Sequence, residues 1–281
     1  MNLQRIFSRT LPLLALSAVL VTGCRREEED TDTNAAADNA LAEATFSDVA
    51  NFTDEAGRTG DLTNYRVGDL EGTLNACATI TFDSLAPADD DTLTIDFGTT
   101  NCTGNDGRNR RGKVIVVYNG RFRDAGHTHT VSFDNYFVND NQVLGTKTVS
   151  NLGPNAAGHT VYDVDVNGQI VLANNGGTIT WTSQRQREWV QGESTAIWSD
   201  DIYSITGSAS GTSANGQSYT MQITSPLIRN MALGCRRHFT QGVLQLTPSN
   251  RPMRTVDFGN GACDNIATVT IGNNTYTIQL R

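Results

Sequence analysis

Hydrophobic and polar residues alternate with a period of two along most of the chain beyond residue 74. Residues 79–82, 93–97 and 161–166 alternate strictly, which is typical of strands with one buried face. Residues 114–117 are apolar at every position, as in a strand buried on both faces. The same criteria predict further strands at 131–133, 177–189, 202–212, 218–224, 242–247, 255–258, 267–271 and 275–280.

Short polar turns separate these strands. They lie at 139–141, 167–168, 174–177, 215–216 and 272–274, and their Asn, Asp and Gly residues tolerate the positive φ of hairpin turns. At Asn119-Gly120 the apolar phase instead continues from Val116 to Phe122, so we predict one long strand there. The sequence therefore predicts an all-β fold with about a dozen antiparallel strands in a meander. A sandwich, a closed barrel and an open half-barrel remain alternatives.

The pattern differs before the first strand. Phe46, Val49, Ala50 and Thr53 follow helical spacing, and Gly57 can end the helix, so we predict one short N-terminal helix. Residues 24–44 are acidic and poor in large apolar side chains, which predicts a disordered acidic tether. Residues 45–281 are then expected to form a single β-rich domain.

The first 23 residues predict a signal peptide. Arg5 and Arg9 precede an apolar run at 11–21, which is about half the length that a membrane-spanning helix needs. The run ends in Val21-Thr22-Gly23-Cys24, which resembles the lipobox of bacterial lipoproteins. The resemblance implies cleavage before Cys24 and a lipid anchor on that cysteine. An ordinary secretory signal is the alternative.

The residues after Cys24 bear on the destination of the protein. No Asp follows Cys24, so the inner-membrane retention signal of lipoproteins is missing. The run Arg-Arg-Glu-Glu-Glu-Asp at 25–30 resembles the export signal of surface lipoproteins of Bacteroidota, and a solvated tether is an equally good interpretation. We therefore expect a lipid-anchored protein of the outer membrane that faces the periplasm or the cell surface.

Charge argues against one class of partner. The net charge of the chain is −9, and loss of the two arginines in residues 1–23 makes it −11. Because binding to phosphates requires a basic face, we do not expect nucleic acid as a partner.

Four cysteines remain beside Cys24, an even number that suits disulfides in an oxidising compartment. The sequence Thr-Ile-Asp-Phe-Gly at 94–98 precedes Cys102, and Thr-Val-Asp-Phe-Gly at 255–259 precedes Cys263, with the same spacing in both. This weak internal repeat predicts disulfides within each unit, Cys77–Cys102 and Cys235–Cys263. Zinc is the rival interpretation, but no C-x-x-C pair is present.

The two Asp-Phe-Gly units, the Arg-Glu-Trp at 187–189 and the Cys-Asp-Asn at 263–265 resemble secreted β-rich lipoproteins of Bacteroidota. This resemblance implies a secreted location and carries no activity with it.

Catalytic patterns are weak. The Gly-Ser-Ala-Ser-Gly at 207–211 has Ala209 where a nucleophile elbow needs serine. Glu188 could act as a glycosidase acid with Asp200 or Asp201 as its partner, but an exposed strand position explains it as well. His127 and His129 lack a third metal ligand. We therefore predict no catalytic residue, no metal and no cofactor.

One stripe is a candidate ligand site. Trp181, Arg185, Arg187 and Trp189, with Ser183, occupy alternate positions and so share one face of a strand. Aromatic and guanidinium groups together can stack on sugars or bind an anion. In the alternative interpretation, Asp163 and Asp165 on a neighbouring strand pair with these arginines.

Taken together, these patterns favour a lipid-anchored envelope protein that acts as a non-catalytic binding or structural module. Its expected partners are the membrane, through the lipid, and an envelope protein or glycan. A carrier of lipid or another small apolar ligand is one alternative, and an enzyme acting on polysaccharide is the other.

Overall fold

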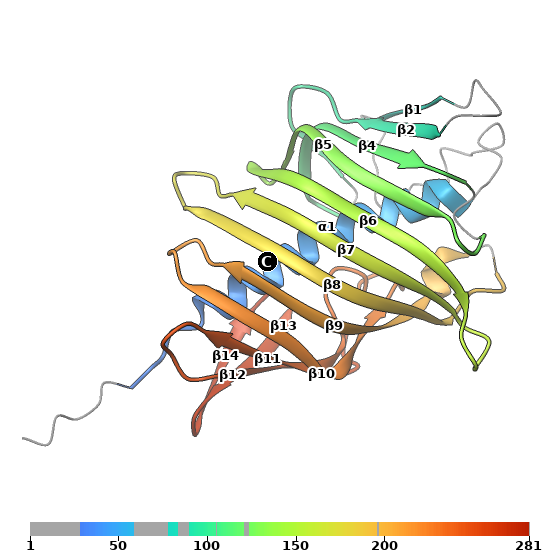
Figure 1. Cartoon of the computed structure of the whole chain (residues 1–281). Coiled ribbons are helices and arrows are strands. Elements are labelled where there is room, and N and C mark those ends of the chain that lie inside the picture. Colours follow the sequence, from blue (N-terminus) through green and yellow to red (C-terminus); the bar gives the residue numbers. More distant parts are fainter. Residues whose placement is uncertain are drawn as a thin grey trace, which may run out of the picture.

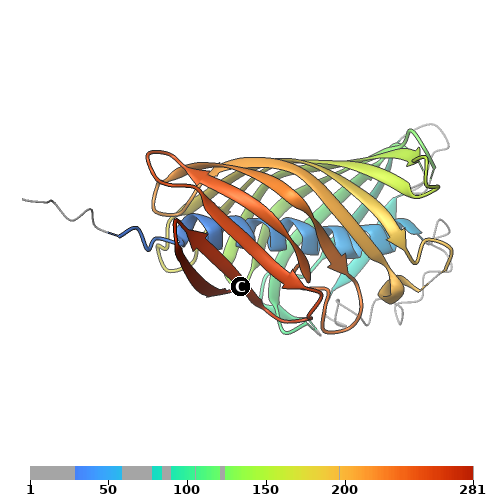
Figure 2. The same ribbon diagram turned by 90° about the horizontal axis from the view of Figure 1, so that it is seen from below.

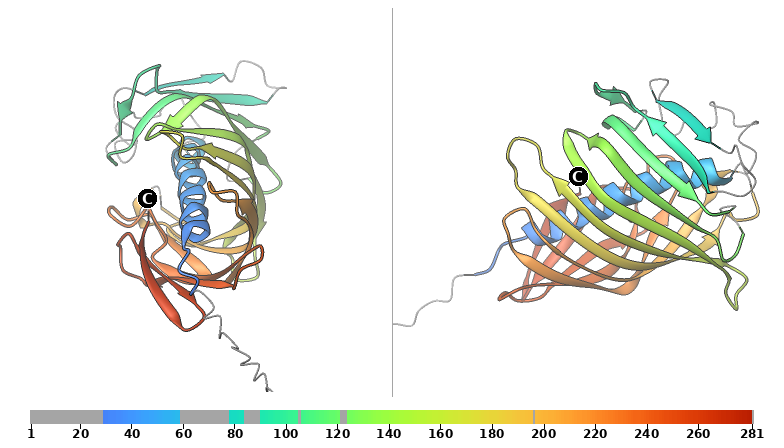
Figure 3. Two further views of the ribbon diagram at one scale, coloured as in Figure 1. Left: turned by 90° about the vertical axis from the view of Figure 1, so that its left-hand side faces the viewer. Right: turned by 45° about the horizontal axis from the view of Figure 1, so that its top comes forward.

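A single antiparallel sheet wraps around one long helix. The computed structural model describes residues 29–58, 78–83, 90–104, 106–120, 124–195 and 197–280. The sheet has 14 strands in chain order, with only β3 off the main path, and its edge strands β1 and β14 are not paired with each other. It forms a trough that is open along one side, and α1 (Asn34–Arg58) lies inside it (Figures 1 and 3). The predicted all-β meander is confirmed, in its half-barrel form.

Each strand on the main path pairs with the next in the chain, which short turns allow and parallel pairing would not. The strands are β1 (Thr79–Asp83), β2 (Asp91–Asp96), β3 (Cys102–Thr103), β4 (Asn109–Tyr118), β5 (Thr128–Val138), β6 (Asn141–Pro154), β7 (Thr160–Val171), β8 (Thr178–Gln191), β9 (Ile202–Thr212), β10 (Ser218–Asn230), β11 (Gln241–Pro248), β12 (Arg254–Asn260), β13 (Ile266–Ile271) and β14 (Asn274–Gln279). One 3-10 turn, η3 (Trp198–Asp200), precedes β9.

Most predicted turns are hairpins in the structure. Asn139 and Asp140 have φ of 49° and 64°, and Asn174 and Asn175 have φ of 55° and 58°. Residues with an Asx side chain tolerate this region better than most others, so the sequence marks these turns clearly.

Two predicted strand boundaries are wrong. The predicted turn at Asn167-Gly168 lies inside β7, where Gly168 pairs with Trp181 of β8. The predicted continuous strand through Asn119-Gly120 instead ends at Tyr118, because the backbone and side chain of Asn119 both bond to the backbone of Thr128 and close the chain toward β5.

The helix is longer than predicted. It begins at Asn34, so the disordered tether predicted for 24–44 is wrong for residues 34–44. Alanine favours a helix, and the Asp32 side chain accepts a hydrogen bond from the N–H of Asn34 at the first turn. The helix buries one stripe of residues spaced by three or four: Ala35, Asn39, Ala42, Phe46, Val49 and Thr53.

The two Asp-Phe-Gly units have the same local structure. Asp96 accepts a hydrogen bond from the N–H of Gly98, and Asp257 accepts one from the N–H of Gly259, each at 2.8 Å. Both glycines have positive φ, and the phenylalanine between each pair is buried. The internal repeat is therefore a repeated strand end.

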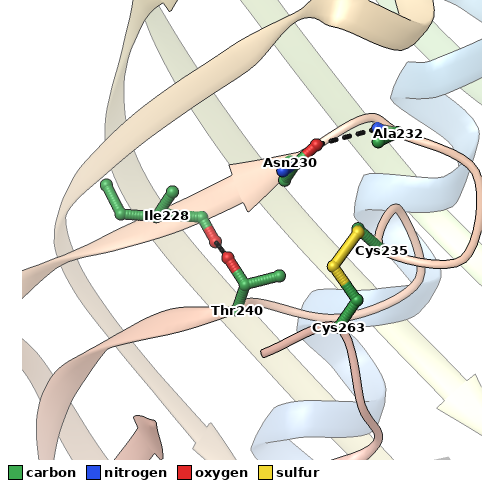
Figure 4. Close-up of a disulfide and its surroundings, with 6 residues drawn as sticks. All are labelled: Ile228, Asn230, Ala232, Cys235, Thr240 and Cys263. Carbon is green, nitrogen blue, oxygen red and sulfur yellow. Dashed lines mark hydrogen bonds between the residues drawn. A yellow bond between two sulfur atoms is a disulfide. The ribbon is translucent and has the colours of Figure 1, made fainter. Parts of the chain in front are cut away.

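The predicted Cys235–Cys263 disulfide is confirmed, and it joins the connection after β10 to the connection after β12 (Figure 4). Cys102 is disulfide-bonded as well. Cys77 lies outside the described residues, so its pairing with Cys102 stays a prediction. Residues 1–23 and Cys24 also lie outside them. Among the residues that are described, no helix is long and apolar enough to cross a membrane.

Candidate functional site

The predicted stripe on β8 lies on the inner face of the trough, where Trp181 and Arg185 contact α1. Trp181, Arg185, Arg187 and Trp189 do share one face, as predicted, and each is at most 8% exposed. Because all four side chains are buried and α1 covers Trp181 and Arg185, the stripe is not open to a soluble ligand while α1 is in place.

The contacts of the stripe are internal. The indole N–H of Trp181 donates to Asn39 of α1 at 3.0 Å, and Arg185 forms a 2.7 Å ion pair with Glu43 of α1. Arg187 lies against the rings of Tyr162 and Tyr203. The indole N–H of Trp189 donates to Asp201 at 3.0 Å. A ligand-binding role for this stripe stays a prediction that requires α1 to leave.

The alternative partners named from the sequence are not the partners of these arginines. Asp163 and Asp165 lie opposite Gln186 and Gln184, on the other face of the sheet. The acidic partner of Arg185 is Glu43 of α1, which lies 142 residues away in the sequence and was therefore not predicted.

The far end of α1 is held by a second buried ion cluster. Asp48 lies 2.6 Å from Arg110 and 3.2 Å from Arg108, and Arg110 also pairs with Asp106. Burial alone would raise the pKa of Asp48, but the attraction of Arg110 and Arg108 outweighs it and lowers that pKa to about 2. Lys147 of β6 donates to the backbone carbonyl of Phe46.

The carboxylates considered for catalysis do not meet. Glu188 accepts hydrogen bonds from Asn155 at 2.9 Å and pairs with His159 at 2.7 Å, which lowers the pKa of Glu188. Asp201 is fully buried under Trp189. Because successive residues of β8 point to opposite faces, Glu188 and Asp201 lie on opposite sides of the sheet.

The two histidines that were considered as metal ligands have different contacts within the protein. His127 contacts the carbonyl of Asn119 at 3.1 Å, and the buried His129 packs against the ring of Tyr118. Within the described part of the chain, no group of three His, Cys, Asp or Glu residues could hold a metal ion.

The outer face of the sheet carries an open groove of about 450 Å³ across β8, β9, β10 and β11. Its outward side chains are all hydroxyls or amides. They are Thr182 and Gln184 of β8, Ser208 and Ser210 of β9, Thr220 and Gln222 of β10, and Gln245 and Thr247 of β11.

The strand register arranges these eight side chains in two parallel rows. The first row contains hydroxyls only: Thr182 lies opposite Ser210, Ser210 opposite Thr220, and Thr220 opposite Thr247. The second row is made of Gln184, Ser208, Gln222 and Gln245 in the same manner. Each row runs across the strands, so its groups repeat at the strand spacing of about 4.8 Å.

Small residues of β9 form the floor of the groove. Ser208 and Ser210 lie between the longer side chains of β8 and β10, which leaves the central strand lower than its neighbours. Gly207 lets β9 approach β8 closely, because a Cβ there would lie 2.2 Å from the carbonyl oxygen of Gln184. Gln222 donates to the carbonyl of Gly207 at 3.1 Å and thereby lies across β9.

Chemically, the groove can donate and accept hydrogen bonds along its whole length and offers no charge. None of its eleven lining residues is ionisable near neutral pH. No protein-family model, curated protein or solved structure matches this chain. The assignment of a role to the groove therefore depends on its geometry alone.

Sequence reasoning missed the groove, although its signal is visible in retrospect. At two neighbouring outward positions on each of the four strands β8 to β11, all eight side chains are Thr, Ser or Gln, without Lys, Glu, Asp or Arg. An exposed sheet face normally carries charge, so the absence of charge from these two rows was the available clue.

Proposed function

We propose that the protein is a lipid-anchored, non-catalytic binding module of the outer membrane whose outer groove binds a neutral glycan. The two rows of hydroxyls and amides are the observation that carries this proposal. Both groups donate and accept hydrogen bonds, as sugar hydroxyls do, and their regular repeat suits a ligand that is itself a repeating chain. The lipobox at 21–24 supports the anchor.

The alternatives fit the structure less well. A carrier of lipid needs a free concave face, and α1 fills that face through ion pairs and ring contacts. A polysaccharide-cleaving enzyme needs two carboxylates on one side of a substrate. Glu188 and Asp201 lie on opposite faces of the sheet, and the groove itself contains no acid.

Filling the floor of the groove tests the proposal. Ser210→Tyr places a large side chain on the central strand, and Thr146→Tyr is the matched control on the exposed outer face of β6. Titration calorimetry against neutral and acidic oligosaccharides is expected to show neutral ligands binding, with an affinity at least tenfold weaker in Ser210→Tyr alone. Equal binding by both variants, or binding of acidic ligands only, would contradict the proposal.

Truncating two glutamines of the second row provides a second test. Gln184→Ala combined with Gln245→Ala removes two hydrogen-bonding groups, at about 1 kcal/mol each, so Kd is expected to rise roughly thirtyfold. Gln186→Ala, the next outward position of β8 and outside the groove, should leave Kd unchanged.

A further inference from the structure

Three hairpins of the sheet surround the start of α1. They are residues 213–217, 249–253 and 272–274, here called the entry hairpins. The backbone N–H of Ala214 donates to Asp38 at 2.8 Å, Arg251 lies 3.0 Å from Asp30, and Asn274 donates to Glu29 at 2.6 Å. In Figure 2 the blue start of α1 lies beside the orange and dark red hairpins of this end.

The chain ahead of α1 is fixed to this end of the sheet. Asp30 lies 2.6 Å from Arg254, a side chain that is only 1% exposed, and Asp32 lies 3.3 Å from Arg251. The hydroxyl of Tyr276 donates to Glu29 at 3.0 Å. The polypeptide is thus attached to β12 and β14 from Glu29 onward, where the sequence predicted a free tether.

The length of chain that remains is short. Only residues 25–28 separate Cys24 from Glu29, and five extended residue steps reach about 17 Å at most. For comparison, the 14 residues of β8 extend for about 45 Å. An acyl chain on Cys24 therefore holds the entry hairpins close to the bilayer and leaves the opposite end of the strands far from it.

The composition of the entry hairpins suits such a position. Their residues include no Asp or Glu and one basic residue, Arg251, although the chain as a whole carries −9. Met253 is 44% exposed beside Pro252, which gives this end an apolar contact. The connections at the opposite end contain the acidic residues Glu193, Asp200 and Asp264 together with the basic residues Arg236 and Arg237. The acidic residues Asp30 and Asp32 that contact this end are paired with Arg251 and Arg254, which reduces their repulsion by an anionic lipid surface.

We propose that the hairpin at 249–253 rests on the lipid surface that holds Cys24, with Met253 at the level of the headgroups. This inference rests on the proposed lipid anchor of Cys24. The strands then extend away from the bilayer, and the rows of the glycan groove, which cross the strands, lie along the side of the domain.

Lipid-borne quenching of a fluorophore tests the contact. The lipidated full-length protein is reconstituted in vesicles of phosphatidylethanolamine and phosphatidylglycerol, with a label at Met253→Cys or, as control, at Ile197→Cys. Ile197 is 60% exposed in the connection between β8 and β9, at the opposite end. Spin-labelled lipid is expected to quench the label at 253 at least threefold more than the label at 197. Equal quenching, or stronger quenching at 197, would overturn the proposal.

A second experiment lengthens the segment between Cys24 and Glu29, so that anchoring and contact of the hairpin with the lipid surface can be measured separately. Twenty Gly/Ser residues inserted after Glu28 have an average reach of about 25 Å, so quenching at 253 should fall at least twofold while the protein stays on the vesicles. Unchanged quenching at 253 would refute the argument from chain length. Flotation of the vesicles reports the anchor independently: if the unlabelled protein, expressed with its own leader, does not float, the anchor in the proposed function fails instead.

Discussion

The ring of Phe46 lies directly over Gly168, so closely that a Cβ at position 168 would be 2.1 Å from the Cζ atom of the ring. The same ring stacks on Trp181 at 5.7 Å and meets Phe133 edge-on at 6.1 Å. The absence of a side chain at Gly168 of β7 thus provides the space into which α1 inserts the ring of Phe46.

Closing this space should displace the helix. Gly168→Ala is expected to lower the free energy of unfolding by about 1–3 kcal/mol, because the added methyl group would overlap the buried ring of Phe46 and force it to move. Urea denaturation measures the loss, and Asn167→Ala, on the outer face, is the control. In a Phe46→Ala background the Gly168→Ala substitution should cost little, and additive losses in the double variant would show that the two residues do not act through each other.

Removing one partner of the ion pair between Glu43 and Arg185 should destabilise the fold, whereas replacing both partners with apolar residues should cost little. Glu43→Gln leaves the buried guanidinium without its anion, so we expect a loss of about 3–5 kcal/mol. The double substitution Glu43→Leu with Arg185→Met should recover most of this loss. The exposed pair of Arg111 and Asp140 offers a control, since Arg111→Met should cost less than about 1 kcal/mol in the same denaturation experiment.

Acid should weaken the packing of α1 through Asp48. Burial raises and the guanidinium groups of Arg110 and Arg108 lower its pKa, with a net value of about 2 against 3.8 for an ordinary aspartate. The depressed pKa stabilises the fold fully above about pH 4, and this contribution, on the order of 2 kcal/mol, is lost as the pH falls from 4 through 2. Denaturation at a series of pH values should show the slope, and Asp48→Asn should show a flatter one. An identical slope in both proteins would contradict the assignment.

The Cys235–Cys263 disulfide should stabilise the fold by restricting the unfolded chain. It closes a loop with a sequence separation of 28, which corresponds to roughly 3.5 kcal/mol. Replacing both cysteines with alanine should lower the unfolding free energy by about that amount and leave glycan binding unchanged, because the bond joins connections outside the groove (Figure 4). A loss of binding with no loss of stability would contradict this separation.

Local pattern predicted the meander because each strand buries one face and each hairpin needs residues that accept positive φ. The local pattern did not predict the structure correctly where the partner of a side chain is a residue of α1. β6 was not predicted, since its inward positions include Lys147, whose partner is a carbonyl of the helix. Asn167-Gly168 predicted a turn, but Gly168 lies within β7 and its lack of a side chain makes room for the ring of Phe46. The acidic residues within 34–44 predicted a disordered segment exposed to solvent, but Asp38 and Glu43 are buried inside the trough.

The candidate groove escaped prediction for a different reason. Its residues are ordinary at each position, and only the register of four strands aligns four hydroxyl side chains in one row and three glutamines with Ser208 in the other. Register depends on hairpin geometry and bulges that a single sequence does not reveal. The inner stripe of Trp181 and Arg185 was conspicuous in the sequence because its residues are large, and their size serves packing.

The helix in the trough also constrains how the chain reaches its native state. Asn39 meets Trp181 across 142 residues, and Asp30 meets Arg254 across 224. The N-terminal segment is synthesised first, yet its partners include residues of the last strands, so its contacts are complete only when those strands have been made. Because these contacts join residues so far apart in the sequence, refolding is expected to be slow.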